Sequence, residues 1–138
     1  MLKVFRVLLV EDNQDDEELT LRSLRKLGKQ IEIEVARDGQ EALDRLFDPE
    51  KPLPNLVLLD LHLPKVGGLQ VLERIRADER TAHILVVVLT SSDEPADVKA
   101  SYQQYANSYI HKPVSLADFS DAVQRMGVYW LQLNLDAS

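Results

Sequence analysis

Acidic, hydroxyl and amine side chains stand at the ends of four apolar segments that are far apart in the sequence. Glu11 and Asp12 follow the first segment, Asp60 and Thr90 end two others, and Lys112 follows the last. If these ends met, the three carboxylates would repel one another unless a hard divalent cation such as Mg²⁺ lay between them. A hydroxyl and an ammonium beside that cation would suit a phosphoryl group, whose charge they offset. The residue types therefore predict phosphoryl chemistry that depends on Mg²⁺.

Each of these residues also has an ordinary structural explanation. An acidic pair after a strand, such as Glu11-Asp12, is commonly a helix N-cap. Thr90 has the alternative role of a loop hydroxyl, and Lys112 that of a solvated surface lysine. The functional interpretation depends on four segment ends that carry matching chemistry together, which is improbable by chance.

Apolar segments and the intervals between them give the elements that must position these residues. Three uninterrupted apolar segments, 7–10, 56–59 and 84–89, are typical of strands buried on both faces of a parallel sheet. Two weaker strands are expected at 31–35, which alternates like an edge strand, and at 108–111. The chain therefore predicts five strands.

Helices are expected in the intervals between these strands. The expected ranges are 15–28, about 39–47, 68–78, 94–106 and 115–134. Strand and helix alternate five times, which predicts an α/β fold with a doubly wound parallel sheet and right-handed crossovers. Ligands bind such sheets at the carboxyl ends of the strands, where the polar residues above are found.

Composition limits the classes of partner. The chain has 138 residues, a net charge of −7 and no cysteine. Its length suits one domain, and its acidic character argues against nucleic acid or an anionic membrane as a partner. The absence of cysteine excludes disulfides and thiolate zinc sites. With no signal peptide and no apolar run of roughly 20 residues, we expect a cytoplasmic protein.

Taken together, the motifs resemble the receiver domains of two-component response regulators, which have the CheY-like (flavodoxin-like) fold. The resemblance covers nearly the whole chain. Its motifs are Val10-Glu11-Asp12-Asn13, Leu59-Asp60-Leu61-His62-Leu63-Pro64 with Gly67-Gly68, Leu89-Thr90-Ser91 and Tyr109-Ile110-His111-Lys112-Pro113. It implies a single receiver domain over residues 1–138, with a five-stranded sheet in the order 2-1-3-4-5 and five helices.

The resemblance also implies a role for each acidic residue. Receiver domains accept a phosphoryl group from a histidine kinase on an aspartate, and the matching residue is Asp60. Asp12 and Asp60 would bind Mg²⁺ directly, Glu11 would act through a water, and His62 would contribute its backbone carbonyl. The resemblance also implies that the chain is not a conventional enzyme, because it would catalyse only its own phosphorylation and dephosphorylation.

Three further residues would form the response to phosphorylation. By resemblance, Thr90 and Lys112 contact the phosphoryl oxygens, and Tyr109 is an aromatic side chain that swings inward when Thr90 moves. The peptide bond between Lys112 and Pro113 is expected to be cis, which is a tolerated arrangement before proline.

A closer similarity is to the stand-alone response regulators that are paired with bacterial phytochromes. It is carried by Asp16, Leu61-His62-Leu63-Pro64-Lys65, Asn107-Ser108-Tyr109 and Tyr129-Trp130-Leu131. It implies that the kinase is a phytochrome-type photoreceptor. His62 departs from the small polar residue often found two positions after the phosphorylated aspartate.

The C-terminal part of the chain carries an apolar stripe at helical spacing. Its residues are Leu116, Phe119, Val123, Met126, Trp130 and Leu133. The first half is expected to pack on the sheet, and an extension at about 127–138 is expected beyond it. We therefore expect a homodimer with Met126, Trp130 and Leu133 near the centre of its interface. Because Gly127 can end the helix, the extension can instead fold back on its own subunit or form an arm.

The sequence therefore predicts a single-domain response regulator that signals by protein contact. One alternative is a phosphate sink or a shuttle to a histidine phosphotransfer protein. Another is a degenerate receiver that only binds partners, which the intact acidic set disfavours. A hydrolase of the haloacid dehalogenase type needs a second aspartate two residues after the nucleophile, where this chain has His62.

Overall fold

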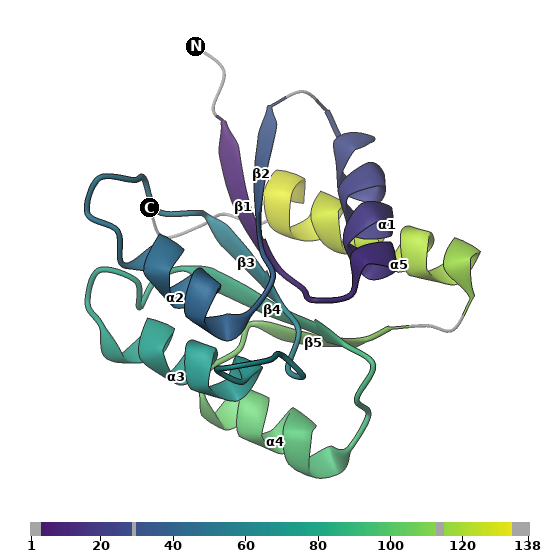
Figure 1. Cartoon of the computed structure of the whole chain (residues 1–138). Coiled ribbons are helices and arrows are strands. Elements are labelled where there is room, and N and C mark those ends of the chain that lie inside the picture. The colour runs from purple at the N-terminus through teal and green to yellow at the C-terminus, as the bar shows by residue number, and fades with distance from the viewer. Residues whose placement is uncertain (1–3, 29, 113–114, 134–138) are drawn as a thin grey trace.

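Five parallel strands form one sheet in a computed structural model that describes residues 4–28, 30–112 and 115–133 (Figure 1). The strands are β1 (Phe5–Val10), β2 (Ile31–Ala36), β3 (Leu56–Leu59), β4 (Leu85–Thr90) and β5 (Ser108–His111). Their order is β2-β1-β3-β4-β5, and every neighbouring pair is parallel. The predicted sheet and its order are confirmed.

Helices cover both faces of this sheet. They are α1 (Gln14–Arg25), α2 (Gly39–Leu46), α3 (Gly68–Ala77), α4 (Pro95–Gln103) and α5 (Leu116–Gly127). Figure 1 shows α1 and α5 on one face of the sheet and α2, α3 and α4 on the other. This division of helices between the two faces is the doubly wound arrangement that the alternating pattern predicts.

Two apolar clusters, one on each face, hold the layers together. Successive side chains of a strand point to opposite faces. Leu8 and Val10 of β1 therefore pack with the cluster under α2 and α3, whereas Val7 and Leu9 pack with the cluster under α1 and α5. The strand β2 alternates between half-buried and exposed residues over most of its length, as expected for the edge of the sheet.

Two helices end earlier than the sequence pattern predicts. The helix α4 stops at Gln103, and Tyr105 then takes a left-handed backbone conformation (φ 61°) that no α-helix can continue. The helix α5 stops at Gly127, and the chain continues as a π-helical segment, Val128–Leu133. A Cβ at Gly127 would lie 2.3 Å from Cδ1 of Leu27, so a larger residue where α5 meets the end of α1 would require that the Leu27 side chain shift.

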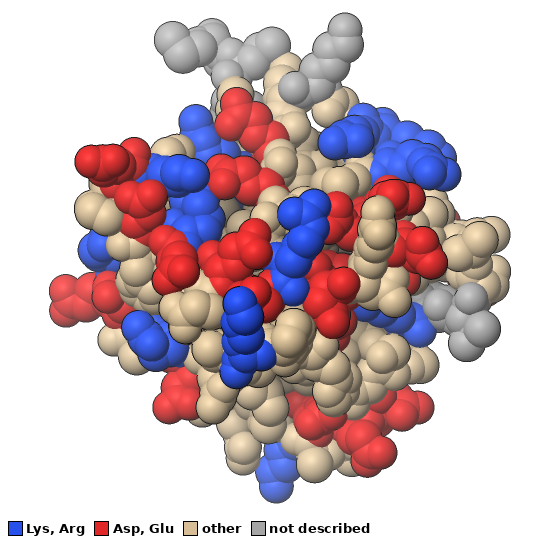
Figure 2. Space-filling model, viewed as in Figure 1, with Lys and Arg blue, Asp and Glu red and all other residues tan. Residues whose placement is uncertain are grey.

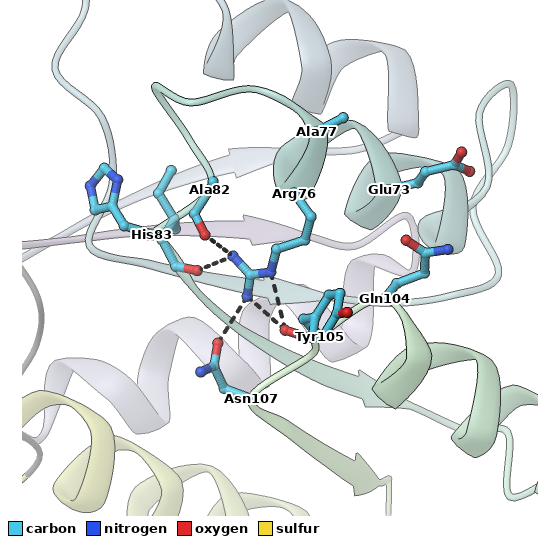
Figure 3. A pocket seen from close by; sticks show the side chains of 9 residues that line it. Glu73, Arg76, Ala77, Ala82, His83, Gln104, Tyr105 and Asn107 are labelled. Carbon is cyan, nitrogen blue, oxygen red and sulfur yellow. Dashed lines mark hydrogen bonds between the residues drawn. The ribbon is translucent and has the colours of Figure 1, made fainter.

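A pocket of about 580 Å³ lies at the end of the sheet where β4 and β5 begin (Figure 3). Arg76 of α3 reaches across it. Its guanidinium donates five hydrogen bonds to four acceptors, which are the carbonyls of Tyr105, Ala82 and Ile84 and the Oδ1 of Asn107. Burial lowers the pKa of Arg76. All five N–H groups are therefore used to hold the α3–β4 and α4–β5 loops against α3.

The surface in the view of Figure 2 mixes charges of both signs. Lysine and arginine side chains stand among aspartates and glutamates over this face, and no large area of it is purely basic. Among the described residues, no helix is long and apolar enough to cross a membrane.

Candidate functional site

The carboxyl ends of four strands bring the predicted residues to one edge of the sheet. Backbone hydrogen bonds continue the pairing just beyond the strands, since Asp60 N donates to the Val10 carbonyl and Lys112 N to the Thr90 carbonyl. These bonds extend the register of the sheet to the residues that follow β3 and β5. Residues that are up to 101 positions apart in the sequence are therefore in contact at this edge.

The N-cap of α1 is Asn13 rather than the preceding acidic pair. Asn13 Oδ1 accepts a hydrogen bond from the backbone N–H of Asp16 at 3.0 Å. Glu11 and Asp12 are therefore not needed to cap the start of this helix, and the ordinary structural explanation for the pair does not apply to them.

Asp60 is buried and fully hydrogen-bonded. Its Oδ1 accepts from Thr90 Oγ1 at 2.8 Å and from the backbone N–H of His62 at 3.2 Å, and its Oδ2 accepts from Lys112 Nζ at 3.3 Å. Burial opposes ionisation, but the charge of Lys112 and the hydrogen bond from Thr90 outweigh it and lower the pKa of Asp60. Asp60 is therefore a carboxylate near neutral pH.

Lys112 is a buried ammonium rather than a solvated surface lysine. Its Nζ donates to Glu11 Oε1 at 2.5 Å, to Asp16 Oδ2 at 2.9 Å and to Asp60 Oδ2 at 3.3 Å. Burial by itself would lower the pKa of Lys112, but its hydrogen bond to Glu11 and the charges of the nearby carboxylates raise it above the usual value. Asp16 thus joins the site, although by residue type the sequence marks it only as one of several acids in the first turn of a helix.

Glu11 is the most deeply buried acid of the site, with 2% of its surface exposed. Burial is the main reason that its pKa rises to about 7, and the charge of Asp60 adds to the rise while Lys112 opposes it. Its second oxygen, Oε2, accepts from the backbone N–H of Asn13 at 3.3 Å.

Three of these carboxylates have the spacing of a metal site. Glu11, Asp12 and Asp60 each offer an oxygen, and these atoms all lie within 4.8 Å of one another. Asp12 is exposed while the other two are buried, so one side of the group opens to solvent. Hard oxygen donors that leave room for water and phosphate oxygens fit a divalent cation such as Mg²⁺.

The predicted response residues are linked through a buried serine, Ser92. Its backbone N–H donates to Thr90 Oγ1 at 3.4 Å, and its carbonyl accepts from the Tyr109 hydroxyl at 2.7 Å. Its own hydroxyl donates to Asp97 of α4 at 2.5 Å. Thr90 also donates a hydrogen bond to Asp60, and the Tyr109 side chain packs against the apolar cluster under α2 and α3. Sequence reasoning missed Ser92, because nothing in its local sequence indicates these partners.

The remaining predicted residues lie elsewhere. Met126 is buried within its own chain, 5% exposed, among residues of the cluster under α1 and α5. A role for Met126 in a subunit interface stays a prediction, since within one chain its side chain packs in the core. Trp130 packs partly against the same cluster. The Leu133 side chain and the Lys112–Pro113 peptide bond lie outside the part of the chain that the structure describes.

Comparison with known proteins gives a consistent result. The family model described as the response regulator receiver domain matches residues 7–124. The "Probable methanogenesis regulatory protein FilR2" of Methanothrix harundinacea is 44% identical over 133 residues, which cover 94% of this chain and 86% of that protein. "Response regulator Rcp1" of Synechocystis is 38% identical over 130 residues, which cover 91% and 88% of the two chains.

Solved structures match over almost the whole chain. The Mn²⁺-bound form of Rcp1 has a TM-score of 0.93 at 36% identity and covers 97% of this chain and 99% of its own. The phosphorylated cyanobacterial phytochrome response regulator RcpA has a TM-score of 0.94 at 34% identity, covering 98% and 99%. The bacteriophytochrome response regulator AtBRR has a TM-score of 0.73 at 44% identity, covering 97% and 100%.

Proposed function

This chain belongs to the response regulator receiver family, and we propose that it accepts a phosphoryl group on Asp60 from a sensor histidine kinase. The observation that carries the proposal is the environment of Asp60. Asp60 is an ionised carboxylate, and it accepts hydrogen bonds from the Lys112 ammonium and the Thr90 hydroxyl, the two donors that a phosphoryl group on Asp60 would need. Positioning and neutralisation of charge are the main requirements of phosphoryl transfer.

The transfer would use one carboxylate oxygen of Asp60 as the nucleophile. A bond forms between that oxygen and phosphorus while the P–N bond of the donor phosphohistidine breaks, and the electron pair of that bond stays with the imidazole nitrogen. Lys112 and Thr90 would then donate to the phosphoryl oxygens. Their present bonds to Asp60 place both donors within reach of the new group.

The proposed metal is Mg²⁺, held by Asp12 and Asp60 directly, by Glu11 through a water and by the backbone carbonyl of His62. Glu11, Asp12 and Asp60 fit a divalent cation in spacing and in chemistry. When bound, the cation would offset the carboxylate charges and attract phosphoryl oxygens. The Mn²⁺-bound form of Rcp1 supports a divalent ion in a close relative.

The proposed signal passes to the surface through the contacts of Thr90. A change at Asp60 would alter the bond from Thr90, and Ser92 joins Thr90 to Tyr109 and to Asp97 of α4. The chain would act in the cytoplasm as one receiver domain over residues 1–138, by contact with a downstream protein. It would work as a switch and not as an enzyme for another substrate.

We further propose a phytochrome-type kinase as the phosphoryl donor, supported by the likeness of this chain to the phytochrome response regulator RcpA and the bacteriophytochrome response regulator AtBRR. A bacteriophytochrome histidine kinase that has been labelled by autophosphorylation should transfer its label to this chain when Mg²⁺ is present. Chelation of Mg²⁺ with EDTA should abolish the transfer. If this kinase transfers no label but acetyl phosphate labels the protein, the donor is another kinase. If neither donor labels the folded protein, the proposed function is wrong.

The proposed homodimer now depends on the end of the chain beyond α5. Tyr129 is half-exposed, and its ring meets the Trp130 ring edge-on at 4.9 Å between centroids. We expect a dimer in sedimentation at tens of micromolar, and we expect Trp130→Ala to shift it towards monomer. Leu116→Ala is the matched control, because Leu116 is an exposed leucine at the other end of α5. A monomeric wild type would contradict this proposal.

A further inference from the structure

At the start of α1, the carboxylate of Asp16 makes no capping bond within its own helix and contacts Lys112 instead. Asn13 is the N-cap, so Asp16 is the third residue of the helix. In a capping box the side chain at this position turns back to the backbone N–H of the cap. Here that N–H instead donates to Glu11 Oε2 at 3.3 Å. The carboxylate of Asp16 is therefore available to a partner outside the helix, and it meets Lys112 at 2.9 Å.

Asp16 shares Lys112 with the reacting carboxylate. An ammonium has three N–H donors, and the three acceptors of Lys112 are carboxylates of Glu11, Asp16 and Asp60. Its longest contact, 3.3 Å, is the one to Asp60. Lys112 therefore has no spare donor, and any bond to a phosphoryl oxygen requires that an existing bond be released.

Burial decides which bond is released. The Glu11 side chain is 2% exposed, so losing its ammonium partner would leave a buried carboxylate without neutralisation. The Asp16 side chain is 31% exposed, so water can replace the ammonium there at little cost. Of the bonds from Lys112 to Glu11 and to Asp16, the one to Asp16 is thus the easier to give up.

We propose that Asp16 is a positioning residue that competes with Asp60 and with an incoming phosphoryl group for Lys112, and thereby slows phosphorylation. This inference rests on the proposed function of Asp60. Asp16 holds part of the positive charge of Lys112 away from the reacting centre. It also adds a negative charge beside the path of a negatively charged donor.

The test is the rate at which acetyl phosphate labels the protein at saturating Mg²⁺, compared between wild type and Asp16→Asn. Asparagine keeps an oxygen of the same size in place but removes the charge. We expect the second-order rate constant of labelling to rise roughly threefold to fivefold, the range that a contact with a partly exposed carboxylate supports. The thermal unfolding midpoint should stay close to that of wild type, because Asp16 is partly exposed. A variant that merely damaged the site would be labelled more slowly, not faster.

Two further variants separate the contact from its charge. Asp15→Asn removes the same charge from the neighbouring, exposed position of α1, and its rate should stay within about twofold of wild type. Asp16→Glu keeps the charge and should remain slow. An unchanged rate in Asp16→Asn, or an equal rise in Asp15→Asn, would overturn the role of Asp16 alone. A folded wild type that takes no label would overturn this role together with the proposed function.

Discussion

Asp60→Asn is expected to take up no measurable label from acetyl phosphate in the presence of Mg²⁺, a loss of about a hundredfold or more. A carboxamide is a poor nucleophile, and the substitution removes the charge that Lys112 faces at 3.3 Å. The measurement is incorporation of label into the purified chain, with acid and base lability of the product to identify an acyl phosphate.

The fold should survive this substitution, because Asp60 lies within a group of carboxylates that repel one another. The lost repulsion is offset by the lost attraction to Lys112, so thermal unfolding of Asp60→Asn should occur close to the wild-type midpoint. Asp15→Asn is the matched control, since it changes an exposed aspartate outside the site and should label normally. Normal labelling of Asp60→Asn would move the nucleophile to another carboxylate of the group, such as the exposed Asp12.

Gly68→Ala is expected to lower the free energy of unfolding by about 3 kcal/mol. Gly68 begins α3 directly against the strand end that carries the site. A Cβ there would lie 2.2 Å from the backbone oxygen of Asp60 and 2.6 Å from the Cα of Leu61. Since backbone atoms cannot swing aside as a flexible side chain does, the segment with Asp60 must move, and labelling should fall with stability. Urea unfolding measures the first effect and acetyl phosphate the second.

The neighbouring glycine provides a strict control for this prediction. A Cβ on Gly67 would have its nearest neighbours, Oε1 of Gln70 and the carbonyl oxygen of Leu61, at 4.0 Å, and the backbone φ of −69° suits any residue. Gly67→Ala should therefore keep both stability and labelling close to wild type. Equal losses in the two variants would show that the close approach of α3 to Asp60 does not limit the fold.

The elements of the fold could be predicted because their signals are local. Uninterrupted apolar segments such as Val7-Leu8-Leu9-Val10 suit only strands covered on both faces, and the alternating 31–35 segment suits an edge. The five residues that carry the chemistry could also be found, since each follows or ends a strand and such strand ends meet in a parallel sheet. The implied strand order came from the resemblance, and the structure confirms it.

Helix ends were harder to predict, because their causes lie in other parts of the chain. An apolar stripe continues past Gly127, which favours one long helix. The α-helix instead stops where Gly127 meets Leu27 of the segment after α1, and Met126 is drawn into the core. This contact joins α5 to its neighbour on the same face of the sheet (Figure 1), and the apolar stripe alone does not contain it.

The sequence by itself determined the sheet, its layers and the reactive residues Asp60, Thr90 and Lys112. Only the tertiary structure decided which other side chains form hydrogen bonds with those residues. Asp16 becomes a partner of Lys112 because the fold brings the first turn of α1 to the residue that follows β5, so that residues 96 positions apart meet at 2.9 Å. Ser92 meets Tyr109 because β4 and β5 are neighbours in the sheet, and its contacts with Thr90 and Asp97 complete the link to α4. Side-chain type and spacing report what a residue can do, whereas distances between elements set which partner it meets.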